Sequence, residues 1–406
     1  MTLCLNPESI EPARTVGSVT FRATLRSKQS GLTLIELLIS MTISLFMLIA
    51  ISLVYISAKT GFAYSNNTVR MSEDASFALE MMGRDIRMAG YAGCRGNTEL
   101  PAATPQPPDL FIPHLDLVDG QVLLAADRPN PFSGVIAGDL TPIFTSRNAV
   151  WGFAATNTTA RNPITGGPTT YTESTTNPML YVAGGSARAL QVSGAVAPAA
   201  NITIPADTYR WANNTNPTFM IIADCRNSEV FRASSVSLAA PFTIAHAATA
   251  NDDANFANSY ESNAVVTPLV TSVYFLATRV GAATPSLYRR FFNGSVAVTE
   301  ELVPNVEAMT FHYGENTTNT PAGAPTFMAD VYRTDPTTVN WSRVVSVRMG
   351  LILVSEDNNK AAVAGQTVQW LDGTYTPPAP TPTTPPDSRL RRAYSTTVSI
   401  RNRMGL

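Results

Sequence analysis

A long apolar segment near the N-terminus limits what this chain can fold into. The stretch from Leu32 to Ile56 contains a single charged residue, Glu36. As an α-helix it would extend about 37 Å, enough to cross the hydrocarbon core of a bilayer. A carboxylate inside such a span costs on the order of 3 kcal/mol to bury, so it is a functional candidate by default. The alternative is that Glu36 reaches back to the membrane interface.

Charges on either side of the apolar segment predict its orientation. Arg22, Arg26 and Lys28 lie close before it, whereas Lys59 and Arg70 follow it. Basic residues favour the cytoplasmic side of a membrane. We therefore expect a cytoplasmic N-terminus, with the bulk of the chain on the other side of the membrane.

The composition excludes several classes of protein. The chain has 406 residues, of which 14% are charged, and its net charge is −2. A nucleic-acid binder needs a clustered positive excess, which is missing. The many Thr, Asn, Ser, Pro and Gly residues indicate an exported, β-rich protein. They do not fit a coiled-coil rod, a polytopic transporter or a small disulfide scaffold.

The residues around the start of the apolar segment carry a family resemblance. Lys28-Gln-Ser-Gly31-Leu32-Thr-Leu-Ile-Glu36 resembles the class III signal of type IV prepilins and type II secretion pseudopilins. The resemblance implies that prepilin peptidase cuts after Gly31, that Leu32 is N-methylated, and that Glu36 is retained inside the span. Leu32 stands where Phe is commonest in that family, and the leader, residues 1–31, is long for it.

The resemblance also gives Glu36 a role in assembly. In a helical bundle of subunits its carboxylate can pair with the terminal amine of a neighbour and set the register, since either charge left alone is costly. Two other interpretations stay open: an ordinary signal-anchor, or a secretory signal cleaved after Ser52. The apolar run is too long for a normal signal peptide.

Beyond the membrane the helical pattern continues. One apolar face recurs at helical spacing, and its members are Met71, Ala75, Ala78, Leu79, Met82, Ile86 and Ala89. Gly90 is placed to end the helix, and Gly61 is a candidate break. We expect a membrane half at residues 32–59 and an amphipathic half at 60–90, whose apolar face packs on a head.

The end of this helix resembles a narrower family. Residues 77–94, with Arg87-Met-Ala-Gly-Tyr91 and the nearby Cys94, resemble the post-membrane signature of PilW-type minor pilins. The resemblance implies a pilin-like α+β fold, with the long N-terminal helix packed on an antiparallel β-sheet head at residues 91–406. Weak resemblance elsewhere predicts long loop insertions, near residues 100–215, 315–340 and 356–388.

Period-two patterns and turn residues predict the strands of the head. The predicted strands are Phe219–Ala223, Glu229–Arg232, Val265–Thr278, Leu287–Phe292, Ser295–Val298, Val306–Tyr313, Val345–Leu353 and Tyr394–Arg401. Asn293-Gly294 is a strong hairpin signal. Alternation within Val345–Leu353 predicts a half-buried strand, and the proline-dense Tyr375–Pro386 predicts an extended loop.

Cysteines predict one covalent link. Once the leader with Cys4 is removed, Cys94 and Cys225 are the remaining thiols. In the oxidising periplasm we expect them to form a disulfide bond, worth about 4–5 kcal/mol in the chain-entropy model. The alternative is two buried free thiols.

No motif indicates catalysis, and no cofactor or metal is expected. The three histidines, His114, His246 and His312, lack zinc-site spacing. Asn251, Asp253 and Asn255 alternate like the start of a calcium loop, but the glycine and the bidentate glutamate of that loop are missing.

The resemblance therefore predicts a minor pilin of a type IV pilus, in a tip complex that initiates assembly for twitching motility and adhesion. The implied partners are prepilin peptidase, other minor pilins, the major pilin and a large tip adhesin. The implied location is the inner membrane and then the pilus. The alternatives are a type II secretion pseudopilin of the GspJ type, or a signal-anchored periplasmic enzyme or binding module.

Overall fold

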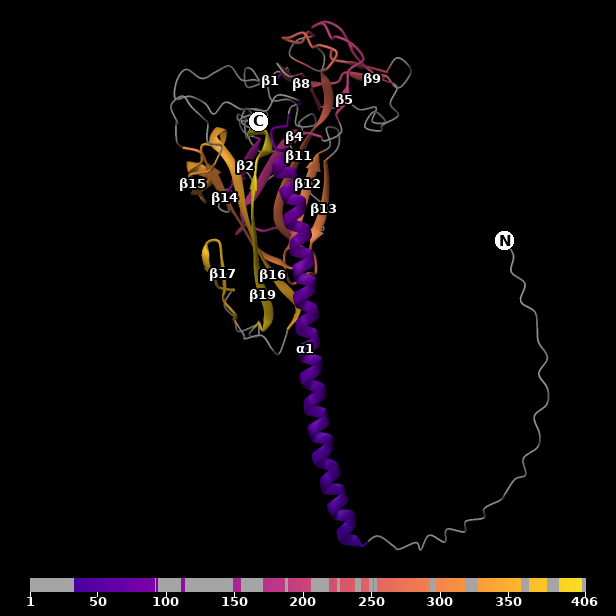
Figure 1. Cartoon of the computed structure of the whole chain (residues 1–406), viewed down its shortest axis with the longest axis vertical. Coiled ribbons are helices and arrows are strands. Elements are labelled where there is room, and N and C mark those ends of the chain that lie inside the picture. Colours follow the sequence, from indigo (N-terminus) through magenta and orange to yellow (C-terminus); the bar gives the residue numbers. More distant parts are fainter. Residues whose placement is uncertain are drawn as a thin grey trace, which may run out of the picture. The chain divides into compact units, whose positions relative to one another are not determined.

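The computed structural model covers the whole chain in two units, Met1–Ala58 and Lys59–Leu406. It describes residues 33–91, 93, 111–113, 149–154, 171–186, 189–205, 219–224, 227–237, 242–247, 251, 254–292, 297–317, 328–358, 365–377 and 387–403. One long helix, α1 (Leu34–Met88), begins in the first unit and ends in the second, and it is drawn in indigo in Figure 1.

Helix α1 is uninterrupted along its length. Gly61, a candidate break, is helical and has no neighbouring atom within 4 Å of the place where a Cβ would stand. The predicted stop is confirmed, because the helix ends at Met88 and Gly90 has a φ of 70°. That left-handed conformation is the usual way to terminate a helix, and glycine adopts it without strain.

The second unit contains a large sheet built around the long strand β11. Its members are β1 (Phe111–Pro113), β2 (Val150–Phe153), β3 (Tyr171–Glu173), β4 (Met179–Gly185), β5 (Leu190–Gln191), β7 (Phe219–Ala223), β8 (Ser228–Arg232), β11 (Val265–Arg279), β12 (Ser286–Phe292) and β13 (Ala297–Val303). Strands β3, β4, β5, β7 and β12 all pair with β11 in antiparallel fashion.

Three smaller sheets complete the second unit. The four-stranded sheet has the order β15 (Val331–Arg333), β14 (Val306–Glu315), β16 (Val344–Asn358) and β19 (Arg389–Ser399). A three-stranded sheet has the order β6 (Ile202–Ile204), β10 (Phe242–Ala245) and β9 (Ser235–Ser237). The last sheet is a hairpin of β17 (Val368–Trp370) and β18 (Gly373–Tyr375). Short 3₁₀ helices lie at η2 (Pro336–Thr338), η3 (Trp341–Arg343) and η4 (Arg401–Arg403).

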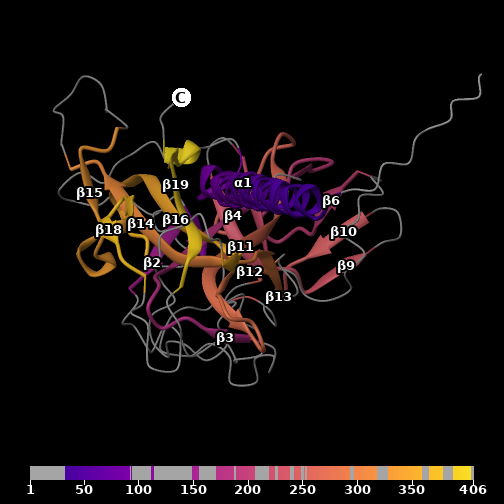
Figure 2. The same cartoon turned by 90° about the horizontal axis from the view of Figure 1, so that it is seen from below.

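One apolar core joins the second half of α1 to both main sheets. It contains Met82 from α1, Leu276 from β11 and Phe311 from β14, all buried. Figure 2, seen from below, shows α1 lying across β4 and β11 and beside β19. The helix therefore covers the place where the two sheets meet, and the predicted packing of a long helix on an antiparallel head is confirmed.

Most predicted strands are confirmed, with some shifted bounds. β7 has the predicted bounds, and β12 pairs with β13 as the hairpin signal indicates, although Asn293-Gly294 lies outside the described residues. The last strand begins at Arg389, five positions before the predicted Tyr394. The pattern does not predict this start because charged residues are usually exposed, whereas those at the start of β19 are buried in an ion-pair cluster.

The prediction of a half-buried strand in Val345–Leu353 was wrong. Both faces of β16 are largely buried, including Ser346, Gly350 and Ile352 on the second face. That face is covered partly by the β17–β18 hairpin, where Leu371 approaches Gly350. The side chain of Asp372 in the hairpin also bonds the ring of His312 on β14. Alternation in a sequence shows one buried face, but it cannot show a cover that comes from a distant segment.

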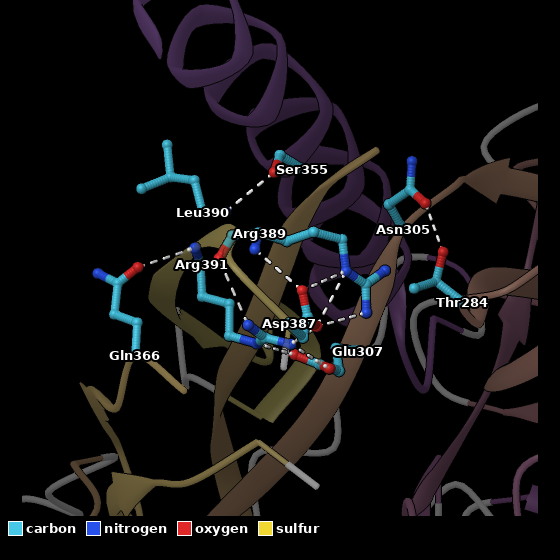
Figure 3. Close-up of polar contacts among 9 residues, drawn as sticks. All are labelled: Thr284, Asn305, Glu307, Ser355, Gln366, Asp387, Arg389, Leu390 and Arg391. Atoms are coloured by element: carbon cyan, nitrogen blue, oxygen red, sulfur yellow. Dashed lines mark hydrogen bonds and ion pairs between the residues drawn. The ribbon is translucent and has the colours of Figure 1, made fainter. Parts of the chain in front are cut away.

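The buried ion-pair cluster, which Figure 3 shows, joins the start of β19 to β14. The Arg391 side chain is 1% exposed, and its Nε donates to Glu307 at 2.6 Å while its Nη2 bonds Asp387. Oδ2 of Asp387 also accepts a hydrogen bond from Nη2 of Arg389 at 2.8 Å. Burial raises the pKa of Asp387, but hydrogen bonds from the two arginines outweigh it and hold that pKa well below its usual range. The four charges balance, which is what a buried ionic cluster requires.

Candidate functional site

At the start of α1, Glu36 takes part in capping the N-terminus of its own helix. Thr33 precedes the helix, and its Oγ1 accepts a hydrogen bond from the backbone N–H of Glu36 at 3.3 Å. In return the backbone N–H of Thr33 donates to Oε2 of Glu36 at 3.4 Å. This is a reciprocal capping box, and it holds the carboxylate at the positive end of the helix. The predicted cleavage residues, Gly31 and Leu32, lie outside the described residues.

The first unit exposes an almost wholly apolar helical surface. Its exposed large side chains are Leu34, Ile35, Leu37, Leu38, Ile39, Met41, Ile43, Leu45, Phe46, Met47, Leu48, Ile49, Ile51, Leu53, Val54, Tyr55 and Ile56. Within the described part of the chain, α1 is the one helix long and apolar enough to cross a membrane. A surface of this kind needs lipid or other helices around it.

Three hydroxyl side chains in this unit are satisfied by their own helix. The hydroxyls of Ser40, Thr42 and Ser44 donate to backbone carbonyls one turn earlier, at 2.7, 2.8 and 2.7 Å. Such internal bonds are what an apolar environment demands, because no water is present to replace them. Glu36 is therefore the one group in the described part of this unit that would carry a charge into the membrane.

The second half of α1 presents its predicted apolar face to the core. Met71, Ala75, Ala78, Met82 and Ile86 are all buried, as the helical spacing predicted. Small residues allow a close approach of the helix to the four-stranded sheet. A Cβ added at Gly83 would lie 3.3 Å from Cγ2 of Val398 on β19.

A buried ionic contact fixes the helix to the large sheet. Asp85 Oδ2 lies 2.9 Å from Nη2 of Arg289 on β12, and it accepts hydrogen bonds from Ser272 and Tyr274 on β11, each at 2.7 Å. Burial and the Asp85 carboxylate raise the pKa of Tyr274 well above its usual range, so its phenol remains a donor. The three groups that contact Oδ2 of Asp85 are all hydrogen-bond donors, and these contacts offset the cost of desolvating the Asp85 and Arg289 charges.

Sequence reasoning missed this contact. Asp85 lies beside the apolar face of the amphipathic half, where a charged side chain is usually solvated. The available signal was Arg289, a charged residue inside the predicted strand Leu287–Phe292. An arginine in a strand that packs on a helix needs a carboxylate, and α1 supplies it. Glu80 and Arg84 are four residues apart on α1, but they form no ion pair with each other in the described structure.

The chain leaves α1 along strand β4. The N–H of Gly90 donates to the carbonyl of Ala183 at 2.8 Å, and the N–H of Gly185 donates to the carbonyl of Tyr91 at 2.7 Å. A Cβ at Gly184 would stand 2.6 Å from the carbonyl oxygen of Met88. Gly90 and Tyr91 are thus hydrogen-bonded to β4, and Gly184 makes room for the end of the helix.

Cys94 and Cys225 lie outside the described residues, but their neighbours meet. Gly93 packs on Ala223, where an added Cβ would lie 2.6 Å from the Ala223 Cβ. Asp224 and Asn227 form a turn, in which Oδ1 of Asp224 accepts the N–H of Asn227 at 2.7 Å. The residue before Cys94 therefore touches the strand that ends just before Cys225.

The other polar candidates have structural partners. The Asn251 side chain accepts from the N–H of Arg232 at 2.7 Å and donates to its carbonyl at 2.9 Å, so it ties a loop to the end of β8. His246 is buried and packs on the ring of Phe256. His114 and Asp253 are outside the described residues, within which no group of metal-ligating side chains occurs.

Comparison with known sequences gives two matches. Residues 273–402 match the family described as Type IV Pilus-assembly protein W, and residues 26–52 match the Prokaryotic N-terminal methylation motif. The first match runs from β11 to η4, and the second includes Gly31, Leu32 and Glu36. No curated protein matches the chain.

Among solved structures, the chain is similar to a type IV-like pilin from Thermus thermophilus. The identity is 17%, and the alignment covers 33% of this chain and 66% of that one, so less than two thirds of its length is matched. The TM-score is 0.20, which is too low to support any conclusion about the fold.

Proposed function

Because this chain belongs to the PilW family of type IV pilus-assembly proteins, and is therefore a minor pilin, we propose that it acts in a tip complex that initiates the pilus. Proteins of this family are structural and not catalytic. The methylation motif implies processing by prepilin peptidase, and the pilus context implies other pilins as partners. The apolar helix fits an inner-membrane anchor before assembly.

The proposed organisation follows the cleavage site. Residues 1–31 are the leader, 32–59 the membrane half of the helix, 60–90 its amphipathic half, and 91–406 the head. Cleavage after Gly31 makes Leu32 the new N-terminus and the site of N-methylation. Its amine then lies on the residue that precedes the cap formed by Thr33 and Glu36.

The observation that carries the proposal is the state of Glu36. Among the described residues, its carboxylate receives two hydrogen bonds, which both come from Thr33 and go to Oε2. Its Oε1 has no partner among residues 33–58, so it can accept a donor such as the terminal amine of a neighbouring subunit. In the low dielectric of a helix bundle, this pairing would fix the axial register of the subunit.

We also propose that Cys94 and Cys225 form a disulfide bond. The contact of Gly93 with Ala223 supports it, since it brings the two segments together. The bond would clamp the end of α1 to β7, at the point where the helix passes into the sheet. That clamp would make the head follow the helix when the helix is drawn into a growing fibre.

The experiment compares two exposed glutamates in cells that assemble pili. Glu36→Ala is expected to be cleaved and inserted normally, yet to be absent from sheared pili, with pilus number as low as in a deletion strain. Glu356→Ala, which changes an exposed glutamate on β16, is expected to behave as wild type. Normal incorporation of the Glu36→Ala protein would contradict the assembly role.

The tip role has a separate readout. Antibody against the head, visualised on intact pili, is expected to mark pilus ends only. Label spread along the shafts at even spacing would contradict a tip complex while leaving the minor pilin assignment intact.

A further inference from the structure

Strand β13 (Ala297–Val303) forms one edge of the large sheet, next to β12 (Figure 1). It pairs with β12 and with no other described strand, and no further backbone hydrogen bond joins its seven residues to the rest of the described chain. In an antiparallel pair, every second residue turns its N–H and C=O away from the partner strand. The outer side of β13 therefore presents a row of donors and acceptors to which a further strand can bond.

Length and exposure set β13 apart from most other edges. The strands β1, β6, β9 and β15, which each end a sheet, have three residues. The longer β19 lies beside α1, where Val398 approaches Gly83. Proteins usually protect an edge by making it short, by covering it or by placing a proline in it. β13 has seven residues and no proline, and its Val298 side chain is 51% exposed.

The side chains on one face of β13 are apolar, acidic and apolar in turn. Val298, Glu300 and Leu302 share this face, because alternate residues of a strand point the same way. Leu302 packs on the core, and the Glu300 side chain is 46% exposed. Oε1 of Glu300 lies 3.3 Å from Nη1 of Arg289, whereas Oε2 has no hydrogen-bond partner among the described residues. A carboxylate oxygen at the middle of the edge can therefore accept a donor from another molecule.

We propose that the outer edge of β13 binds an extended segment of another protein as an added β-strand, with a basic side chain of that segment opposite Glu300. Main-chain hydrogen bonds give such a contact its affinity, and alternate side chains give it specificity. Since Val298 and Leu302 lie two residues on either side of Glu300, the matching positions of the segment are apolar, basic and apolar at every second residue. The inference goes beyond the proposed function, because neither processing nor the membrane helix uses this edge of the head.

The charge on the edge argues against a second copy of this chain as the occupant. An antiparallel pairing of two β13 strands that joins all seven residues would place Glu300 directly opposite Glu300 of the copy. Like charges in directly opposite positions destabilise a strand pair. Glu301 adds a second carboxylate to the same strand, and its side chain is 27% exposed. The acidic edge therefore disfavours self-association and favours a segment of opposite charge.

The test compares the binding of two labelled peptides to the full-length protein in detergent micelles. Thr-Val-Thr-Arg-Thr-Val-Thr carries the proposed pattern, and Thr-Val-Thr-Glu-Thr-Val-Thr reverses its charge. Measured by fluorescence anisotropy, the arginine peptide is expected to bind about fivefold more tightly than the glutamate peptide. Equal binding of the two peptides, tighter binding of the glutamate peptide, or no binding of either would overturn the proposal.

Two variants assign the preference to a residue. Glu300→Gln removes the charge from the edge and keeps a side chain of the same size, so the preference for the arginine peptide is expected to fall below about twofold. Glu356→Gln is the matched control, because it changes an exposed glutamate on β16, and it is expected to keep the wild-type preference. Both variants are expected to unfold at the wild-type temperature. An unchanged preference in Glu300→Gln would contradict the proposed pairing.

Hydrogen exchange of the backbone amides locates the bound strand in the wild-type protein, without any substitution. Saturation with the arginine peptide is expected to slow exchange about tenfold at alternate residues of β13, and to leave β19 unchanged. Protection of β19 instead, or of no strand, would show that the peptide does not extend the large sheet.

A photo-cross-linking amino acid at position 298 identifies the occupant of the edge in cells. The expected product joins this chain to a segment of another protein in which apolar, basic and apolar residues alternate as proposed. A product with β13 of a second copy, a product with a helix, or no product would overturn the proposal. None of these outcomes depends on cleavage after Gly31 or on Glu36, so the edge contact and the proposed function can fail separately.

Discussion

Asp85 of α1 and Arg289 of β12 form a largely buried ion pair at 2.9 Å, the polar fixed point of an otherwise apolar helix–sheet interface. Apolar packing alone would allow the helix to slide or rotate by small amounts, because dispersion contacts are not directional. The carboxylate accepts three donors from two adjacent strands, and this geometry sets both the height and the rotation of the helix on the head.

Removing the arginine is expected to destabilise the head strongly. Arg289→Met leaves the Asp85 carboxylate buried without its cation, which typically costs about 3–5 kcal/mol. Arg279→Met is the matched control, because Arg279 is exposed and its ion pair with Glu301 is long, at 3.9 Å. Its loss is expected to be within about 1 kcal/mol. Urea unfolding of the full chain in detergent, followed by tryptophan fluorescence, measures both, and equal losses would contradict the anchoring role.

A second prediction concerns the passage from α1 into the sheet. Gly184→Ala would push a methyl group against the carbonyl of Met88, and an overpacked site of this kind costs about 1–3 kcal/mol. Gly194→Ala serves as control, because no atom lies within 4 Å of its added Cβ. Thermal unfolding of the two variants is the measurement. A Gly184→Ala protein as stable as the control would show that the helix end does not press on β4.

The helix was predictable to a degree that the head was not. Helical spacing gave the buried residues Met71, Ala75 and Met82, and Gly90 gave the end, because local geometry decides both. Ion pairs across elements are different. Asp85 meets Arg289, and Glu307 meets Arg391, only after distant segments have folded, so nothing near either residue in the sequence reveals the partner.

The sequence also does not reveal which strand faces are covered by distant segments. The β17–β18 hairpin lies in a stretch that was expected to be an insertion, and it buries the second face of β16 through Leu371. For the candidate site, the signal around Gly31 was informative because membrane insertion and processing depend on short contiguous motifs.

The cluster around Asp387 predicts a pH dependence. Its arginine partners hold the pKa of Asp387 below the ordinary value of 3.8, so the ionised form stabilises the fold at higher pH. This contribution is present above about pH 5 and declines as the pH falls through 3.8 toward the lower folded-state pKa. Asp387→Asn is therefore expected to be less stable than wild type at pH 7, with the difference shrinking as the pH falls below 4. A difference that stays constant from pH 7 to pH 3 would rule out this coupling.

The disulfide prediction has a direct chemical test. Intact protein isolated under thiol-blocking conditions is expected to carry no blocking group on Cys94 or Cys225, and to gain two after reduction. Replacing either cysteine with serine is expected to lower stability by about 4–5 kcal/mol in the chain-entropy model, or less if the bond is strained. Two blocked thiols before reduction would mean that both cysteines are free.

Cleavage after Gly31 is the step on which the proposed assembly role depends, and mass spectrometry of the native N-terminus tests it most directly. The predicted result is a mature chain that begins with N-methylated Leu32, three residues before Ile35 and four before Glu36. An unprocessed chain that retains residues 1–31, or one that begins at Leu53, would contradict it.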